Sequence, residues 1–250
     1  DYETVKAKTG IEIINIPIQE LLDTIKSIPT PNTDELLAMS PNENISKALP
    51  MAEQIYLALK AIIKKYALSG FTLRCFDLLT AVKNTGCLAL AKFNSEGIIA
   101  TCEGDVPAML SMAITNSLAK VSGFQANPAH INPTSGEMLF AHCTIPFNMI
   151  ERFEFDTHFE SGIGVGIRGY MKNGPVTIFK VSGNLSRHFA EEGELVSSQA
   201  KPNLCRTQQV IQLDKADKAN YFLTNPIGNH HIIVPGKMKS LFDEFMKNCE

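Results

Sequence analysis

The spacing of apolar residues in the first half of the chain predicts helices that alternate with short strands. Residues 11–16 form a β-branched run typical of a strand, and residues 21–28 follow as a short helix. From residue 51 to residue 66, apolar side chains recur at three- and four-residue steps, which predicts an amphipathic helix that ends before Gly70. The further elements expected in this half are strands at residues 71–76 and 98–102 and a helix at residues 86–93.

The last strand of this series leads into a helix with a clear start signal. Asp105 can cap that helix, and Pro107 suits its first turn because a proline lacks only an N–H that would be unpaired there. Leu110, Ile114 and Leu118 share one face of the helix. Strands that alternate with helices in this way indicate a parallel sheet.

After Gly123, short β runs alternate with turn signals, which is typical of an antiparallel barrel or sandwich. A last helix is expected at residues 238–246. We therefore expect a partial α/β domain over residues 1–122 and an antiparallel, barrel-like β domain with a terminal helix over residues 123–250. The strands expected in the second half are residues 138–143, 164–170, 176–182, 194–198, 206–213 and 231–234.

Charge and composition exclude several classes of function. The net charge of −3 provides no long-range attraction for nucleic acid or for an anionic membrane. No stretch of apolar residues is long enough to span a bilayer, and the first residues lack the features of a signal peptide. The six cysteines show no CxxC spacing, so we expect reduced thiols in a cytoplasmic protein.

Candidate chemistry lies in short acid and histidine clusters that interrupt the apolar runs. These groups are borderline-hard ligands that suit Mn²⁺, Zn²⁺ or Fe²⁺. Glu103 follows a predicted parallel strand directly, which is the usual position of functional residues in open α/β sheets. The segments that carry these clusters and their neighbours are CEGDVPAML (102–110), FQANPAHINP (124–133), FAHCTIP (140–146), THFESGIGVGIRG (157–169), LCRTQ (204–208) and GNHHIIVPG (228–236).

In their order and wording, these segments resemble the C-terminal part of the L-fucose/L-arabinose isomerase-like family, in its fucose-isomerase-related branch. The resemblance runs from about residue 68 to residue 236. It implies that Glu103 is a metal ligand and a catalytic acid/base, and that His231 is a second ligand. His158 falls where arabinose isomerases carry a ligand histidine. Asn127 departs from the pattern, because fucose isomerases carry a metal-binding aspartate there and an amide cannot take up a proton.

Other candidate residues keep alternative interpretations. Neighbouring side chains of a strand face opposite sides, so one of His230 and His231 can be a ligand while the other packs or contacts substrate. His158 suits a ligand or a substrate contact, and Glu160 is a candidate second acid. Arg206 can bind a sugar hydroxyl, bind an anionic substituent or form a structural ion pair.

Two further residues of the clusters favour structural roles. Asp105 favours helix capping over ligation. His142 lies in an apolar strand, which favours a place in the core or behind the ligands.

The resemblance implies a cytoplasmic, Mn²⁺-dependent or other divalent-metal-dependent enzyme that interconverts an aldose and a ketose through an enediolate. It also implies a homo-oligomer, trimer or hexamer, and N-terminal Rossmann-like domains that precede this segment in the family. Expected partners are a small sugar, with no nucleic acid and no membrane. The alternative is a sugar-binding or assembly module of the same fold that has lost catalysis, for which Asn127 is the motive.

Overall fold

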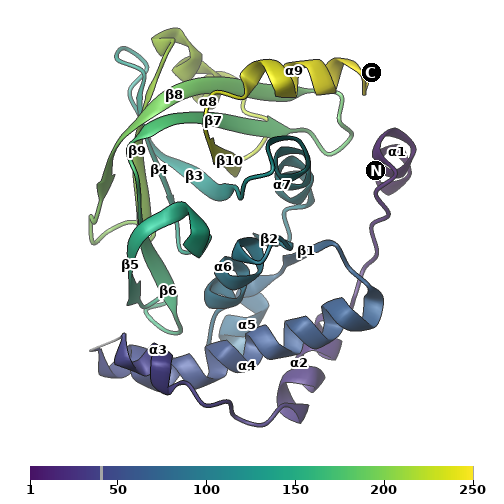
Figure 1. Cartoon of the computed structure of the whole chain (residues 1–250), viewed down its shortest axis with the longest axis vertical. Coiled ribbons are helices and arrows are strands. Elements are labelled where there is room, and N and C mark those ends of the chain that lie inside the picture. The colour runs from purple at the N-terminus through teal and green to yellow at the C-terminus, as the bar shows by residue number, and fades with distance from the viewer. Residues whose placement is uncertain (40–41, 250) are drawn as a thin grey trace.

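A computed structural model describes residues 1–39 and 42–249 of the chain. Figure 1 shows an α/β part beside a β-barrel, with helix α7 (Val106–Ala119) between them. The expected fold class is confirmed, because a small parallel sheet with helices precedes a closed antiparallel barrel and a terminal helix.

The α/β part is built on two short parallel strands, β1 (Gly70–Leu73) and β2 (Ile99–Cys102). Its core contains fully buried side chains such as Ile55, Leu78 and Phe93. The other helices of this part are α1 (Tyr2–Thr9), α2 (Ile18–Ser27), α3 (Asp34–Ala38), α4 (Glu43–Tyr66), α5 (Cys75–Ala81) and α6 (Cys87–Ser95).

The structure corrects two element predictions in this half. Residues 11–16 form no strand and have no β partner; Ile11, Ile13 and Ile16 pack against the buried clusters, whereas Ile14 is exposed. The predicted strand at residues 71–76 ends at Leu73, and α5 begins two residues later. The helix expected at residues 86–93 is confirmed as α6, and Asp105 caps α7 by accepting the N–H of Ala108.

The second half of the chain forms a closed six-stranded barrel of antiparallel pairs, in the order β10-β3-β4-β9-β8-β7. A separate ribbon, β5 with β6, packs beside it, and helix α9 (Lys239–Lys247) follows the last strand. The remaining elements are β3 (Phe124–Ile131), β4 (Glu137–His142), β5 (Ile150–Asp156), β6 (Gly166–Met171), β7 (Gly174–Val181), β8 (His188–Gln199), β9 (Thr207–Leu213), β10 (His231–Pro235), α8 (Asn220–Thr224) and the 3-10 turns η1 (Phe147–Met149) and η2 (Ala216–Ala219).

All six strands predicted in this half occur, although β8 is longer than expected. Two strands were not predicted. Strand β3 contains Pro128, which suggests a break, and the structure accommodates it with an irregularity in the register between Pro128 and His130. Strand β5 alternates Phe153 and Phe155 with charged residues, and these rings face inward against the barrel core.

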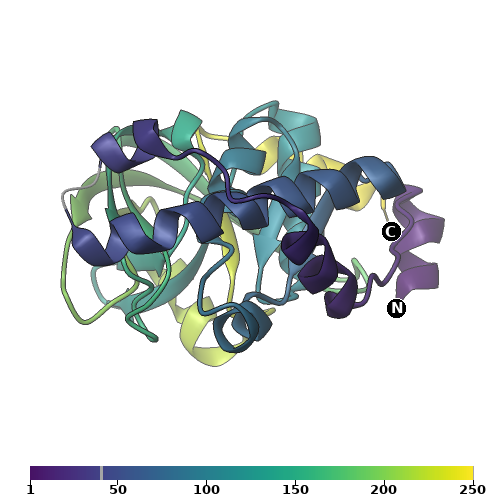
Figure 2. The same ribbon diagram turned by 90° about the horizontal axis from the view of Figure 1, so that it is seen from below.

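Helices α7 and α4 join the parts, and α7 packs both on β2 and on the barrel strands β7 and β10. The long helix α4 crosses the lower face of the molecule (Figure 2). Its start packs Ile45 and Leu49 against Leu88 and Val165, and its end belongs to the α/β core.

Among the helices that the structure describes, none combines the length and apolar character that a membrane span requires.

Candidate active site at the end of strand β2

The turn after β2 holds Glu103 in a conformation that non-glycine residues adopt rarely. Its φ is 66°, in the left-handed region, and Gly104 follows with a φ of 67°. Strain of this kind persists only where the surroundings enforce it, and it is concentrated at functional sites. Asp105 then starts α7, so the turn projects Glu103 from the end of the parallel sheet.

Side chains on both sides hold this strand end in place. Gln125, on β3, accepts the N–H of Cys102 at 2.7 Å and donates to the Cys102 carbonyl at 3.3 Å. The Sγ atoms of Cys102 and Cys75 lie 2.9 Å apart. The barrel therefore fixes the residue before Glu103 through its backbone.

Two histidines of the barrel half flank the Glu103 carboxylate. Nε2 of His142 lies 3.6 Å and Nε2 of His230 lies 3.5 Å from the same carboxylate oxygen. Both rings are almost fully buried, whereas 33% of the Glu103 side chain is exposed. His142 and then His230 hold the pKa of the Glu103 carboxyl well below its usual range, so it is ionised at neutral pH.

Asp105 and Lys180 stand behind His230. Oδ2 of Asp105 lies 2.9 Å from Nδ1 of His230, and Nζ of Lys180 lies 3.4 Å from both Asp105 oxygens. Burial alone would lower the pKa of His230, but its two carboxylate neighbours raise it to about 9. Burial would likewise raise the pKa of Asp105, but His230 and Lys180 lower it.

The donor atoms at this point could hold a metal ion. Ligand atoms of Cys102, Glu103 and His142 lie within 4.8 Å of one another. Within residues 1–39 and 42–249, Nε2 of His230 and Oδ1 of Asn127 are buried without a hydrogen-bond partner. Buried polar atoms without a partner are costly, and a bound ion or ligand would satisfy them.

His231 occupies a different place from that of His230. It is fully buried and lies among aromatic rings, including Phe189 and Phe222. Its Nε2 lies 3.1 Å from the Tyr221 hydroxyl and its Nδ1 lies 3.2 Å from the Asn229 carbonyl. Burial lowers the pKa of His231 to about 3. The structure thus brings His230, rather than His231, to Glu103.

The other predicted residues lie on a loop after β5 and beside the start of β9. Nδ1 of His158 lies 3.1 Å from Oγ of Ser161, and Glu160 is exposed. Burial lowers the pKa of His158, while the charges of Glu160 and Glu103 oppose this effect. Among the described residues, the side-chain hydrogen-bond partner of the His158 ring is Ser161 rather than Glu103.

Arg206 is anchored to this loop. Its Nε donates to the Thr157 carbonyl at 2.7 Å, and the same nitrogen lies 3.3 Å from Oδ2 of Asp156. Arg168 donates to that carboxylate at 2.8 Å, so two guanidinium groups share it. Arg206 therefore forms the ion pair that was one of its three predicted roles, at the base of the loop that carries His158.

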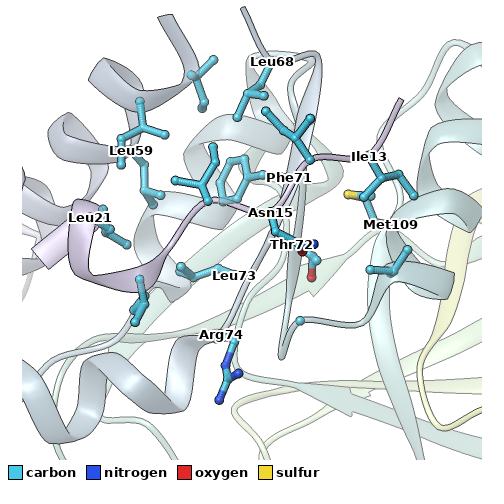
Figure 3. Close-up of a pocket in the computed structure, with 18 of the residues that line it drawn as sticks. Ile13, Asn15, Leu21, Leu59, Leu68, Phe71, Thr72, Leu73, Arg74 and Met109 are labelled. Carbon is cyan, nitrogen blue, oxygen red and sulfur yellow. The ribbon is translucent and has the colours of Figure 1, made fainter. Parts of the chain in front are cut away.

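A pocket of about 280 Å³ lies on the far side of the Glu103 turn. It is mainly apolar, and Figure 3 shows Leu59, Leu68 and Phe71 beside the segment that carries Ile13. Gly104 contributes to its wall, but the side chains that flank Glu103 do not. The pocket is therefore distinct from the polar cluster.

Three residues of this site have weak signals in the sequence. For His142 the sequence favours a place in the core or behind the ligands, and in the structure its buried ring lies beside Glu103. Gln125 and Lys180 were not singled out. Gln125 lies within the FQANP segment, two residues before Asn127, so the sequence could have indicated it. Lys180 lies in an apolar strand that contains no other signal.

Comparisons with known proteins identify sugar isomerases among the similar chains. No family model matches the sequence. The chain is 25% identical over 160 residues to a sulfoquinovose isomerase of Alkalicoccus urumqiensis, covering 62% of this chain and 36% of the relative. It is 24% identical over 192 residues to sulfoquinovose isomerases of Priestia aryabhattai and Priestia megaterium, covering 72% of this chain and 43% of each relative. The chain thus spans less than half the length of these relatives and is similar, at low identity, to sugar isomerases.

Proposed function

We propose that this chain carries the catalytic centre of a divalent-metal-dependent aldose–ketose isomerase. The observation that carries the proposal is the ionised Glu103 carboxylate, held at a strained strand end between the Nε2 atoms of His142 and His230. The similarity to sulfoquinovose isomerases supports the same class of reaction.

The donor set fits a divalent ion. Carboxylate and imidazole suit Mn²⁺, which we propose as the ion. Nδ1 of His230 donates to Asp105, which leaves Nε2 directed at Glu103. We propose that Glu103, His142 and His230 hold it. When bound, such an ion supplies Lewis-acid stabilisation of the charge that develops on the substrate oxygens.

The side chains of the site perform the proton transfer. In the proposed reaction, a Glu103 oxygen takes the proton from the carbon next to the aldehyde and returns it to the aldehyde carbon, while the hydroxyl proton of that neighbouring carbon moves to the aldehyde oxygen. Asn127 cannot take up a proton, so its amide would bind a substrate oxygen instead. His158, Glu160 and Arg206 lie on or beside a loop near Glu103, and we propose them as substrate contacts.

The whole protein is the right object for the test. Sulfoquinovose is the first substrate to assay, followed by unsulfonated aldoses, each with Mn²⁺. We expect interconversion of one aldose and its ketose, loss of activity on chelation and recovery when Mn²⁺ is restored. The absence of metal-dependent turnover across the panel would contradict the proposal.

A sugar-binding module without catalysis is the second candidate. Asn127 favours it, because its buried Oδ1 lacks a hydrogen-bond partner among the described residues and its amide replaces the aspartate that the family resemblance implies. Calorimetry separates the two functions. Sugar binding that is unaffected by removal of metal, together with no turnover, would favour the module.

We also propose that the whole protein is a cytoplasmic homo-oligomer, a trimer or a hexamer, as the family resemblance implies. Measurement of its molar mass in solution tests the assembly, and a monomer would contradict it.

A further inference from the structure

Lys180 is a buried cation on strand β7, and its side chain is only 1% exposed. Among the ion pairs of residues 1–39 and 42–249, its partner is Asp105, with Nζ 3.4 Å from each carboxylate oxygen. Burial of a charge carries a desolvation penalty that is similar in size to the attraction a well-placed partner provides. A Lys–Asp pair at this depth therefore contributes little net stability, and its value lies in what it orders.

The two carboxylate oxygens of Asp105 interact with three donors. Oδ1 accepts the N–H of Ala108 at 2.8 Å, Oδ2 lies 2.9 Å from Nδ1 of His230, and Lys180 lies near both oxygens. The carboxylate is thereby held from the α7 side by the helix cap and from the barrel side by Lys180. Its orientation in turn sets the plane of the His230 ring.

The chain beside His230 is shaped to leave room for this lysine. A Cβ atom on Gly228 would lie 3.3 Å from Cε and 3.5 Å from Nζ of Lys180. The segment that leads to His230 therefore packs directly on the lysine side chain. This packing joins Lys180 to the same histidine from a second direction.

We propose that Lys180 is a positioning residue that acts through Asp105 to direct Nε2 of His230 at Glu103. The inference rests on the proposed function, in which His230 helps to hold a divalent ion. In the described chain, the only ion-pair partner of Lys180 is the Asp105 carboxylate. It therefore acts on the ion and the substrate through His230.

The direction of the change in Mn²⁺ affinity on removal of Lys180 separates a positioning role from a simple effect of its charge. A positive charge near a cation site weakens binding of the cation, so its removal alone would tighten the binding of Mn²⁺. Loss of a residue that orients a ligand through a second group weakens metal binding, typically by about 10–100-fold. The two explanations thus predict opposite changes for the same variant.

The test uses the intact protein with Lys180→Met, which keeps the length of the side chain, and Lys180→Arg, which keeps its charge. Lys237→Met is the matched control, because Lys237 pairs with Asp214 and is 35% exposed. Calorimetry with Mn²⁺ alone measures affinity. We expect Lys180→Met to bind Mn²⁺ about 10–100-fold more weakly, and both other variants to bind it as the wild type does.

A second readout does not depend on metal. The bond between Nδ1 of His230 and Asp105 should protect one imidazole N–H, which proton NMR of the metal-free protein detects as a downfield signal that His230→Gln lacks. Lys180→Arg should keep this signal and Lys180→Met should lose it. If the wild type binds no metal but the signals behave in this way, the proposed function fails while the positioning role stands.

Two results would overturn the role of Lys180. One, for a wild type that binds Mn²⁺, is an affinity of Lys180→Met equal to or tighter than that of the wild type. The other is persistence of the downfield signal in that variant. Where Lys180→Met fails to fold, the double variant Asp105→Asn/Lys180→Met replaces it, because it leaves no unpaired buried carboxylate. The double variant should show the same loss of affinity, and wild-type affinity in it would also overturn the proposal.

Discussion

Glu103 is ionised, partly exposed and held in a strained backbone conformation, while the two rings beside it are buried. A left-handed backbone costs a non-glycine residue on the order of 1–3 kcal/mol, so the surroundings of Glu103 must hold it in this conformation. The neighbouring histidines favour its charged form, so the carboxylate is available as an acceptor of protons and as a ligand at neutral pH.

The first prediction concerns the charge of this carboxylate. Glu103→Gln keeps the shape but cannot accept a proton, so the proposed isomerase activity of the whole protein should fall by about 10²–10⁴-fold. The thermal midpoint of unfolding should change little, because the side chain lies at a strand end outside the core. A fall in activity matched by loss of the folded state would leave Glu103 without a direct role.

The adjacent histidines provide a matched pair. His230→Ala removes an Nε2 directed at Glu103, so Mn²⁺ affinity measured by calorimetry should fall by at least about tenfold. His231→Ala removes a ring whose two nitrogens already have protein partners, so it should lower stability and leave Mn²⁺ affinity near the wild-type value. The reverse pattern would restore His231 as the ligand that the sequence indicated.

His231 also predicts a pH dependence of stability. Its pKa is about 3 in the folded protein and 6.5 as the unperturbed value, so the unfolded state binds the proton more readily. The free energy of unfolding should therefore fall as the pH drops below about 6.5, by up to about 1.4 kcal/mol per pH unit.

Denaturant unfolding of the metal-free protein at several pH values measures this slope. His231→Gln should reduce the slope between about pH 6.5 and about pH 5, a window above the usual range of carboxyl pKa values. His230 does not interfere, because its pKa of about 9 places its own contribution between pH 6.5 and pH 9, where stability is lost as the pH rises. An unchanged slope would mean that His231 does not titrate as its burial requires.

At the scale of elements, the site depends on how strand β2 ends against the barrel. Gln125 is 3% exposed and forms two hydrogen bonds with the backbone of Cys102, as a neighbouring strand would. One side chain thus connects the parallel sheet with β3 and sets the distance between Glu103 and the barrel histidines.

Removal of this connection should be costly. Gln125→Leu leaves the buried N–H of Cys102 without an acceptor, so the free energy of unfolding should fall by about 1–3 kcal/mol. Denaturant unfolding measures the change. Gln19→Leu, on the exposed face of α2, is the control and should stay within about 0.5 kcal/mol of the wild type. Equal effects of the two substitutions would show that the Gln125 bonds do not hold the strand end.

The same scale shows what sequence patterns could predict. Alternation and turn signals were sufficient for β4, β6, β7, β9, β10 and α6, and for the second half of β8. Strand β3 could not be predicted in this way, because Pro128 lies within it. Residues 11–16 have the composition of a strand, but pairing requires a free neighbouring edge in register, and composition carries no information on that neighbour.

The site itself was only partly predictable for a related reason. Glu103 follows a strand directly, so its place in the fold is legible in the sequence. The choice between His230 and His231 depends on which side of the barrel wall each ring faces, and His230 lies just before β10 begins. Lys180 reaches Asp105 across the fold, at a separation of 75 residues, a contact that no local pattern encodes.

At the scale of the whole molecule, the site lies where the two parts meet. Glu103 and Asp105 come from the proposed domain of residues 1–122, and His142, Lys180 and His230 come from that of residues 123–250. Buried hydrogen bonds also cross this boundary, as from Oγ1 of Thr144 to the carbonyl of Cys87 at 2.8 Å. A centre assembled from both parts requires the two to fold together.

Location of a bound ion tests this account most directly. Crystals of the whole protein soaked in Mn²⁺ should show an anomalous diffraction peak within bonding distance of Glu103, His142 and His230, and the peak should be absent from crystals of Glu103→Gln. A peak bound by His158 or His231, or no peak beside Glu103 at saturating Mn²⁺, would contradict the proposed centre.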